Sequence, residues 1–446
     1  MKIAVIGTGI AGLSLAHFLH RRHEIVVYEK EPRIGGHSRT VVVQHGEKAI
    51  PVDTGFIVFN HKNYPNLTRL FEYLGVRTKK SDMSFALTVR DGWLEWGARN
   101  TNAIFGQRPN LLRPSFLHLF AEVMRFNARV QTMAAECTGF SLGDLLDRMN
   151  LSEAFRTHYL LPMAGAIWSC PPTQMLAMPA QSFVRFFSNH GLLSTSGQPQ
   201  WITVEGGSQT YVDKLAAPLA SRIRTHSAVV EVLRHWKGAK VRDRHGHLED
   251  FDHVVFASHA DETLRMLGDA TPQERATLGA FSYQRNDVVL HSSPQFMPKR
   301  RRCWASWVYH SDGTGAEDRI CVSYWMNKLQ SIDERYPTFV TLNPTSEIPS
   351  RNVFDRHVFW HPVFDRPALE AQRELAAMQG DRRTWFCGAH LANGFHEDGL
   401  VSAINVANNL GGCVPWMAQK GPQELGSGYG CEGPPVAAHA QGLVAA

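Results

Sequence analysis

The sequence predicts an α/β protein in which a Rossmann-type domain is joined to a second, mixed α+β domain. Three observations predict this fold class. A strand, a glycine-rich turn, a helix and a second strand open the chain, and a further glycine pair follows the second strand. With 446 residues, the chain is also longer than one ordinary hydrophobic core.

The composition and charge exclude several classes of protein. Hydrophobic residues make up 43% and charged residues 20%, as in a globular protein. The net charge of +5 is too small to predict binding to nucleic acid. The seven cysteines are scattered without metal-type spacing, so we expect free thiols, no metal site and a cytoplasmic location. No apolar run is long enough to predict a transmembrane helix.

The first strand and helix carry a glycine motif. Residues 2–6, "KIAVI", predict a buried parallel strand, and "GTGIAG" follows with Gly7, Gly9 and Gly12 at G-x-G-x-x-G spacing. In this context Gly7 permits a tight turn, Gly9 lets the backbone approach a pyrophosphate, and Gly12 allows close packing of helix and strand.

The second strand ends in a carboxylate. Glu29 stands twenty residues after Gly9, where it can accept hydrogen bonds from the ribose hydroxyls of an adenosine. The helix N-terminus offers its N–H groups and dipole to the phosphates. Ala11 in the first helical turn and Lys30 after Glu29 are further candidates for binding the cofactor. The alternative is a glycine-rich turn in an α/β protein that binds no dinucleotide.

A second glycine loop, "RIGGHSRT", follows the acidic residue. Gly35 and Gly36 would let another backbone segment reach an extended cofactor, beside His37, and Arg33 and Arg39 add positive charge. This double loop resembles the N-terminus of the flavin amine oxidase and carotenoid desaturase superfamily. The resemblance implies FAD as the cofactor.

Three later segments extend this resemblance. In "PVDTGFIVF", an Asp-x-Gly turn would bring Asp53, Thr54, Gly55 and Phe56 near the flavin. In the middle of the chain, Val229 matches the strand residue whose backbone pairs with the adenine. Near the end, a strand finishes at Gly388 and a helix follows with Asp398 as its expected N-cap.

The resemblance implies that the N-terminus of this late helix points at the pyrimidine edge of the flavin. Gly399, Leu400 and Val401 would lie there. The chain departs from the superfamily at one position, because Ala389 stands where an acidic residue is common. Glu397 is the candidate replacement.

A closer resemblance rests on stretches such as "DTGFIVFNHKNYPNLTRLFEYLGV", "LPMAGAIWSCPP" and "GFHEDGL". They are similar to the N-terminal flavin domain of plant cyclopropane fatty acid synthases and to its free-standing bacterial homologues. The resemblance implies a fatty-acyl or phospholipid substrate. It also implies a cyclopropane-synthase-like methyltransferase as a possible partner.

We expect a discontinuous FAD-binding domain and a substrate domain. The FAD-binding domain is predicted at 1–85, 205–265 and 375–412, the substrate domain at 86–204 and 266–374, and a disordered tail at 413–446. The segments 84–89, 166–170 and 182–187 supply large apolar side chains that would line a tunnel for an acyl chain.

Two segments are candidates for contact with the inner face of the membrane. Residues 108–133 place apolar residues at helical spacing with arginines between them, which predicts either a helix covering its own core or one lying on lipid. Residues 297–307, "MPKRRRCWASW", fit an anionic membrane surface or a solvated hairpin turn equally well.

Several residues are candidates for the chemistry. His396 and Glu397 precede the flavin-directed helix and are the catalytic candidates for proton transfer, with helix capping as the alternative role. An ordinary histidine pKa near 6.5 would let His396 shuttle a proton at neutral pH. Asn60, Tyr64 and Trp168 are candidates for the substrate pocket, with packing as the alternative.

Three functions fit these observations. The first is an FAD-dependent oxidoreductase that transfers hydride to or from a modified, unsaturated acyl chain. The second is a flavin amine oxidase. The third is a non-catalytic flavoprotein that docks a lipid methyltransferase.

Overall fold

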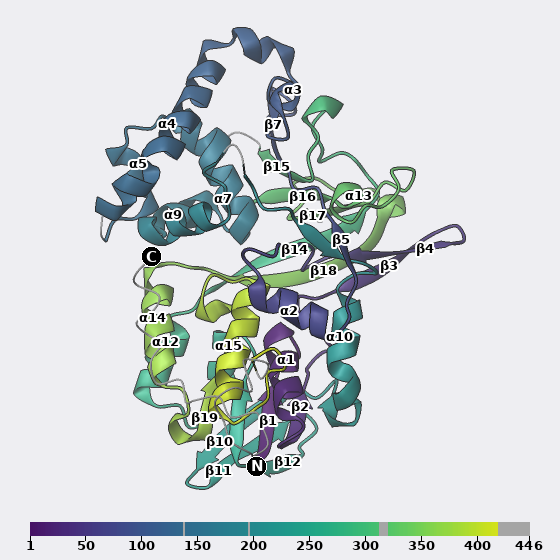
Figure 1. The fold of residues 1–446 in the computed structure, drawn as a ribbon, viewed down its shortest axis with the longest axis vertical. Coiled ribbons are helices and arrows are strands. Elements are labelled where there is room, and N and C mark those ends of the chain that lie inside the picture. The colour runs from purple at the N-terminus through teal and green to yellow at the C-terminus, as the bar shows by residue number, and fades with distance from the viewer. Residues whose placement is uncertain (137–138, 195–196, 312–319, 418–446) are drawn as a thin grey trace, which may run out of the picture.

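The protein has two lobes stacked along its long axis (Figure 1). The computed structural model describes residues 1–136, 139–194, 197–311 and 320–417. Most of the expected tail, residues 418–446, therefore lies outside the described residues. Of the rest, Trp416 packs edge-on against Phe18 with ring centroids 5.6 Å apart. No helix in the described ranges is both long and apolar enough to cross a membrane.

The lower lobe is built on a five-stranded parallel sheet with the order β19-β13-β1-β2-β9. Its strands are β1 (Lys2–Ile6), β2 (Glu24–Tyr28), β9 (Ile223–Arg224), β13 (His253–Phe256) and β19 (Thr384–Phe386). All of β1 after Lys2 is buried because both faces of the sheet are covered. Ile3 and Val5 face one core, and Ala4 and Ile6 face another.

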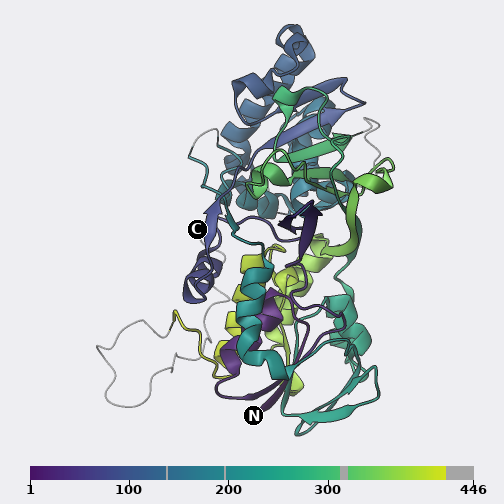
Figure 2. The same ribbon diagram turned by 90° about the vertical axis from the view of Figure 1, so that its right-hand side faces the viewer.

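Helices cover one face of this sheet, and a smaller sheet with further helices covers the other (Figures 1 and 2). On the first face lie α1 (Ile10–Leu19), α2 (Pro65–Tyr73), α10 (Gln209–Ala216) and α15 (His396–Asn409). On the second face lie β10 (Val229–His235), β11 (Gly238–Asp243), β12 (Leu248–Phe251), α11 (Ala260–Met266), α12 (Pro272–Gly279) and α14 (Arg366–Ala377).

The upper lobe contains a seven-stranded mixed sheet with the order β18-β14-β17-β16-β15-β6-β7. Its strands are β6 (Phe85–Val89), β7 (Leu94–Gly97), β14 (Tyr283–His291), β15 (Trp307–Ser311), β16 (Cys321–Trp325), β17 (Phe339–Leu342) and β18 (Val353–Pro362). The helices of this lobe are α3 (Thr101–Ile104), α4 (Pro114–Glu136), α5 (Leu142–Arg148), α6 (Glu153–Phe155), α7 (Leu161–Trp168), α8 (Pro172–Ala177), α9 (Ala180–Asn189) and α13 (Met326–Leu329).

Two ribbons lie at the junction between the lobes. They are β3 (Thr40–His45) with β4 (Lys48–Asp53), and β5 (Thr78–Lys80) with β8 (Ile202–Val204). The strands of the parallel sheet fall within the three segments predicted for the FAD-binding domain. Those of the seven-stranded sheet fall within the segments predicted for the substrate domain, except that β6 begins one residue earlier. The predicted boundaries stay predictions.

Candidate functional site

The candidate site lies at the carboxyl edge of the parallel sheet. Because its strands run in the same direction, Gly7, Glu29 and Gly388 follow the ends of β1, β2 and β19 at one edge. Ligands of open parallel sheets bind outside this edge. The structure thus places these three predicted cofactor-binding residues at the same edge of the sheet.

The first glycine loop has the geometry that its spacing predicts. Gly7 has a φ of +110°, and a Cβ on Gly12 would lie 2.0 Å from the Gly7 carbonyl oxygen. A Cβ on Gly9 would meet no atom within 4 Å, so the space beside Gly9 is open. Helix α1 begins at Ile10, and within the described chain no side chain caps its N-terminus. The helix end, with Ala11 in its first turn, is therefore available to an anion.

The second glycine loop packs directly on the first. The Gly35 N–H donates to the Thr8 carbonyl at 3.0 Å, and a Cβ on Gly36 would lie 3.0 Å from the Gly9 Cα. Gly35 and Gly36 have φ values of +111° and +57°, which favour glycine. The two backbone segments thus form one continuous lining beside the start of α1.

Arg33 supplies a buried donor to this lining. Its Nη2 donates to the Gly36 carbonyl at 2.8 Å, while its Nη1 is buried and has no partner within the described ranges. Burial lowers the pKa of Arg33. A buried guanidinium nitrogen is costly without an acceptor, and a phosphate oxygen is a suitable one. Arg39, in contrast, already makes a two-point ion pair with Asp355 at 2.7 and 3.0 Å.

Glu29 is buried behind the glycine loop. Its Oε2 accepts hydrogen bonds from the Thr8 N–H at 3.2 Å and from the Thr8 hydroxyl, and its Oε1 accepts one from the Glu31 N–H at 2.9 Å. A carboxylate has about four acceptor positions, so Oε1 retains capacity for a ribose hydroxyl. Lys30 pairs with Glu262 of α11 at 2.5 Å.

Helix α15 lies beside α1 at the same edge. A Cβ on Gly399 would lie 3.0 Å from Ile10 Cγ2, so the first turns of the two helices are in contact. The Gly388 N–H donates to Ser402 Oγ at 2.8 Å, which fixes the end of β19 against α15. Leu400 is buried and Val401 is half-buried.

These features fit the FAD that the sequence predicts. They are two helix N-termini at one edge, a buried arginine nitrogen without a partner, open space beside Gly9 and a carboxylate with a free acceptor position. Val229 begins β10, and the register of its pairing with β11 shifts at this point. Its predicted pairing with adenine stays a prediction.

The turn after β4 closes the site from the side of the upper lobe. A Cβ on Gly55 would lie 2.1 Å from the His37 carbonyl oxygen, which also accepts the Phe56 N–H at 2.9 Å. Thr54 donates its N–H to the Arg39 carbonyl at 2.9 Å. The segment predicted near the flavin is thus hydrogen-bonded to the second glycine loop.

Asp53 is a buried junction between elements of both lobes. Its Oδ1 accepts from Thr40 at 2.6 Å and from the Ser208 N–H and hydroxyl at 2.8 Å, and its Oδ2 accepts from Gln330 at 3.0 Å. Burial raises the pKa of Asp53 to about 6. The sequence reasoning placed Asp53 near the flavin but missed Gln330, because nothing in its local sequence marks it.

His396 lies half-buried between the second glycine loop and Phe56. Its ring stacks on Phe56 with centroids 3.9 Å apart, and its Nε2 lies 3.0 Å from Ser38 Oγ. Ser38 also hydrogen-bonds to the Tyr211 hydroxyl. Burial lowers the pKa of His396 to about 3. The expectation of an ordinary pKa near 6.5 is therefore wrong, and His396 is neutral at pH 7.

Glu397 holds the start of α2. Its Oε1 accepts from the Asn66 N–H at 2.9 Å and the Asn66 side-chain amide at 2.8 Å, and its Oε2 accepts from the Leu67 N–H at 2.9 Å. The carboxylate thus caps α2 and ties it to α15. The catalytic roles of Glu397 and His396 stay predictions.

The start of α15 also differs from expectation. Asp398 is the third residue of the helix, since Phe395 stands at the N-cap position. Its side chain accepts the Phe395 N–H at 2.9 Å, as in a capping box. The carboxylate was correctly recognised as a cap, but its position in the helix was wrong by three residues.

The three predicted pocket residues are all buried. Asn60 accepts the Asn63 N–H at 2.8 Å and leaves its Nδ2 without a partner in the described chain. Tyr64 packs near Phe59, and burial raises its pKa. Trp168 lies at the end of α7, and its indole nitrogen is likewise buried without a described partner. Their roles in a pocket stay predictions.

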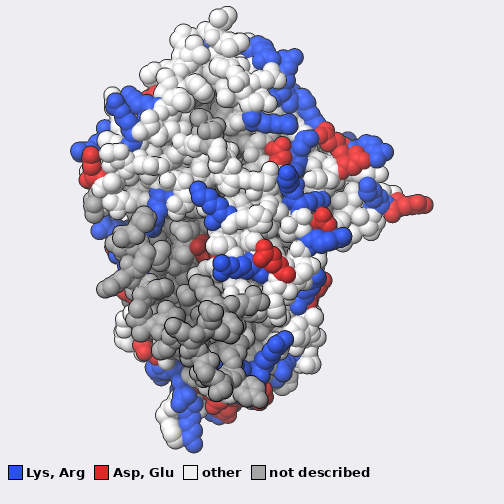
Figure 3. Space-filling view, viewed as in Figure 1, with Lys and Arg blue, Asp and Glu red and all other residues white. Residues whose placement is uncertain are grey.

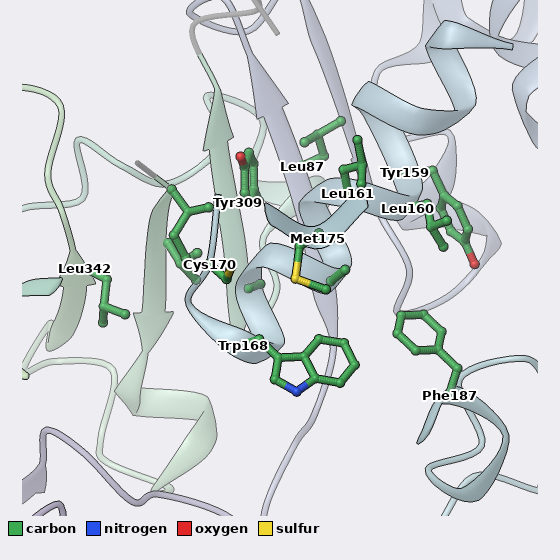
Figure 4. Packing of buried hydrophobic residues seen from close by; sticks show 14 of the residues in the cluster. Leu87, Tyr159, Leu160, Leu161, Trp168, Cys170, Met175, Phe187, Tyr309 and Leu342 are labelled. Carbon is green, nitrogen blue, oxygen red and sulfur yellow. The ribbon is translucent and has the colours of Figure 1, made fainter. Parts of the chain in front are cut away.

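Trp168 belongs to an aromatic series that the sequence reasoning did not assemble. Figure 4 shows Trp168 beside Met175, with Phe187 across from it. The Trp168 and Phe186 rings are 4.6 Å apart, and Phe186 stacks on Phe395 at 5.0 Å. The series therefore extends from the core of the upper lobe to the residue before α15. The aromatic run in "SFVRFF" and the Phe395 next to His396 were its only signals.

Comparison with known proteins decides the family. The model of the family described as flavin containing amine oxidoreductase matches residues 10–278, more than half of the chain. The chain belongs to this family. The prediction of FAD as cofactor is thereby confirmed, as is that of an FAD-dependent oxidoreductase at the level of the family.

Among curated relatives, a protein assigned as flavin-containing monoamine oxidase AofH of Mycobacterium tuberculosis is 28% identical over 263 residues. The match covers 56% of this chain and 55% of the relative. The 15-cis-phytoene desaturase of Synechococcus elongatus is 25% identical over 190 residues, which are 40% of this chain and 39% of the desaturase. The chain thus spans about half or less of the length of these relatives.

Solved structures confirm the predicted fold class. A fatty acid isomerase from P. acnes has a TM-score of 0.63 at 14% identity and covers 91% of this chain and 98% of its own. Cyclohexylamine oxidase from Brevibacterium oxydans has a TM-score of 0.65 at 15% identity, with 92% and 99% covered. Putrescine oxidase bound to putrescine has a TM-score of 0.68 at 14% identity, with 92% and 99% covered. At these identities the likeness concerns the fold alone.

Proposed function

We propose that this protein uses FAD to transfer hydride to or from the acyl chain of an unsaturated fatty acid or phospholipid that bears a methyl or methylene group. The aromatic series of Trp168, Phe186 and Phe395 is the observation that carries this proposal. On this proposal these side chains would line the path of the acyl chain to the N-terminus of α15. An acyl chain needs such a lining, because each buried CH₂ contributes about 0.8 kcal/mol.

On this proposal, different residues of the site bind different parts of the cofactor. Bound FAD supplies the carrier of the hydride. Arg33 and the N-terminus of α1 bind its pyrophosphate, and Glu29 binds its adenosine ribose. The N-terminus of α15 stabilises negative charge on the ring system. Phe56 and the neutral His396 exclude water beside α15, which leaves an apolar surrounding for a hydrocarbon.

Two likenesses add support. The sequence resembles the flavin domain of plant cyclopropane fatty acid synthases, and one protein of similar fold is a fatty acid isomerase. On this proposal a cyclopropane-synthase-like methyltransferase would be the partner that modifies the double bond.

Anaerobic reduction of the yellow holoprotein tests the proposal. We expect the visible flavin absorbance to bleach with phospholipids or fatty acids that carry a methyl or methylene branch, and not with putrescine or cyclohexylamine. If the acyl compound instead accepts hydride from the flavin, it should reoxidise dithionite-reduced protein in the absence of oxygen. Phe186→Ala should slow the reaction with long acyl chains more than with short ones.

An amine oxidase is the second candidate, and the likeness to a monoamine oxidase favours it. Bleaching by amines, with release of ammonia and peroxide in air, would replace the acyl proposal. If neither acyl compounds nor amines exchange electrons with the flavin, a non-catalytic role beside a methyltransferase is the remaining interpretation.

A further inference from the structure

The outer end of the upper lobe carries a row of exposed apolar side chains. They come from a short 3-10 helix, Arg108–Leu112, and from the first half of α4. Their exposed fractions range from 39% to 89%, with Leu112 the highest. This row, called here the α4 ridge, consists of Leu111, Leu112, Leu117, Phe120 and Met124.

The ridge is not the core-facing side of α4. The opposite side of the helix already buries Phe116, Leu119, Phe126 and Val130. Helix α4 is therefore apolar on two sides, and packing against its own core accounts for only one of them. A contiguous apolar patch on the surface of a protein marks a site of interaction.

The charge of the segment that carries the ridge is mostly positive. Residues 101–136, which end with helix α4, contain four arginines and two acidic residues, Glu122 and the exposed Glu136. Glu122 is buried and hydrogen-bonded to Ser152, so it contributes no exposed negative charge. Figure 3 shows this end of the molecule mostly free of charged side chains, with Lys and Arg and a few Asp or Glu at its margins.

An aromatic residue stands beside the ridge. Trp93 is exposed over about half of its surface, and the guanidinium groups of Arg90 and Arg113 lie 5.7 and 5.5 Å from its ring. Tryptophan and arginine together are typical of side chains at the boundary between lipid and water, where the ring is half-buried and the charge meets phosphate.

We propose that the α4 ridge docks the protein on a membrane that contains anionic lipid. Separate protruding side chains such as Leu112 enter a lipid surface without a complementary groove. The arginines beside the ridge would attract anionic headgroups, because they outnumber the exposed carboxylates Asp91 and Glu136.

The position of the ridge fits the proposed acyl substrate, and the inference rests on that function for its purpose. Helix α4 packs against α9 on its buried side. Helix α9 carries Phe186, which stacks on Phe395 at the start of α15. Apolar side chains therefore link the docking face to the flavin site through two packed helices.

The other membrane candidate, residues 297–307, is less suited. Lys299 pairs with Asp91 at 2.5 Å, and Arg300 pairs with the buried Glu95 at 2.9 Å. Arg301 pairs with Glu334 at 2.8 Å and lies over Trp304. Three of the four basic residues of this loop have acidic partners, so it presents less free positive charge than its sequence suggests.

Vesicle flotation with the holoprotein tests the proposal. We expect binding to vesicles of phosphatidylcholine with added phosphatidylglycerol, and weaker binding to phosphatidylcholine alone. The double variant Leu112→Glu/Phe120→Glu should lose about tenfold in affinity or more for each side chain removed from lipid. Trp236→Glu is the matched control, because Trp236 is 83% exposed in the other lobe and should bind as the wild type does.

The arginines are tested separately. Arg113→Gln/Arg129→Gln should weaken binding about fivefold for each charge on anionic vesicles, and much less on phosphatidylcholine. The proposal is overturned if the wild type floats with neither vesicle, or if the ridge variant floats equally well. It is also overturned if the ridge variant only converts a self-associated wild type to a monomer while vesicle binding persists.

A second readout separates this inference from the proposed function. Ridge variants should keep the wild-type rate of electron exchange with a detergent-dispersed acyl substrate and lose it with the same substrate in vesicles. If the protein binds vesicles but no acyl compound reacts with the flavin, the docking proposal stands and the proposed acyl chemistry is wrong. If dispersed acyl substrate reacts but the protein does not bind vesicles, the acyl chemistry stands and the docking proposal is wrong.

Discussion

The ring of His396 lies on the ring of Phe56, with centroids 3.9 Å apart and planes inclined by 18°. Burial lowers the pKa of His396 to about 3. The imidazole is therefore a neutral hydrogen-bonding partner of Ser38 at physiological pH, and a protonated His396 would have to leave this contact.

His396→Asn should accordingly retain FAD and slow flavin reduction by less than about tenfold, the scale of one lost hydrogen bond. The rates of wild type and variant should have the same pH dependence between pH 5 and 8. Stopped-flow absorbance measures both. A loss of about 10²-fold, together with the disappearance of an inflection near pH 6.5, would instead identify a general acid or base.

Glu397→Gln should destabilise the protein by about 1–3 kcal/mol and leave the rate of flavin reduction nearly unchanged. Glutamine keeps one acceptor oxygen but turns an amide towards an N–H group of α2. Thermal unfolding and single-turnover reduction give the two quantities. A rate loss with unchanged stability would assign Glu397 to the chemistry.

Glu29→Ala should weaken FAD binding by about 1–3 kcal/mol, because a hydrogen bond to a charged group is lost. Fluorescence titration of apoprotein with FAD measures the effect. Glu31→Ala is the matched control, since Glu31 is an exposed carboxylate two residues away. Equal effects from the two variants would show that Glu29 acts only through general negative charge.

Arg33→Gln should weaken FAD about tenfold or more, through the loss of a charge-assisted hydrogen bond to phosphate. Arg39→Gln should instead lower thermal stability, because Asp355 loses its partner, with a smaller effect on FAD. The contrast is measured by titration with FAD and by thermal unfolding. The reverse order would move the phosphate contact from Arg33 to Arg39.

The stability of the holoprotein should fall as the pH decreases from about 6.5 to 4. Burial lowers the pKa values of several histidines in the fold, so the unfolded chain binds more protons in this window and gains stability relative to the native state. Asp53 and Asp398 have pKa values raised to about 6 and act in the opposite direction, but they are fewer. These histidines include His37, His291, His361, His390 and His396.

Replacing one of these histidines tests the direction in which stability changes with pH. His361→Asn should make the melting temperature less dependent on pH between 7 and 5, and the exposed His61→Asn should leave the dependence unchanged. Differential scanning fluorimetry over this range is sufficient. A steeper dependence in His361→Asn would show that the buried ring is charged in the native protein.

Much of the cofactor-binding edge could be predicted from the sequence. The glycines of both loops and Glu29 follow fixed spacings, because a tight turn and a close backbone approach allow few residue types. The aromatic series and Gln330 could not be predicted in this way. Their partners lie far away in the chain, and local patterns do not carry such contacts.

The pKa of His396 likewise depends on a contact between distant segments. The sequence places His396 correctly before α15, but its pKa depends on burial by Phe56, which is 340 residues earlier. For the same reason the sequence left open whether 108–133 covers a core or lies on lipid. Only the packed structure shows that the helix has one buried apolar side and one exposed.

The contact of Glu397 with Asn66 and Leu67 joins segments that are made at very different times. Synthesis at about 5–20 residues per second leaves an interval of about twenty seconds to more than a minute between them. Until α15 has emerged, the glycine loops of the N-terminus have no second helix beside them. Stable insertion of the flavin should therefore be a late event, and ribosome-bound chains stopped before α15 should remain colourless.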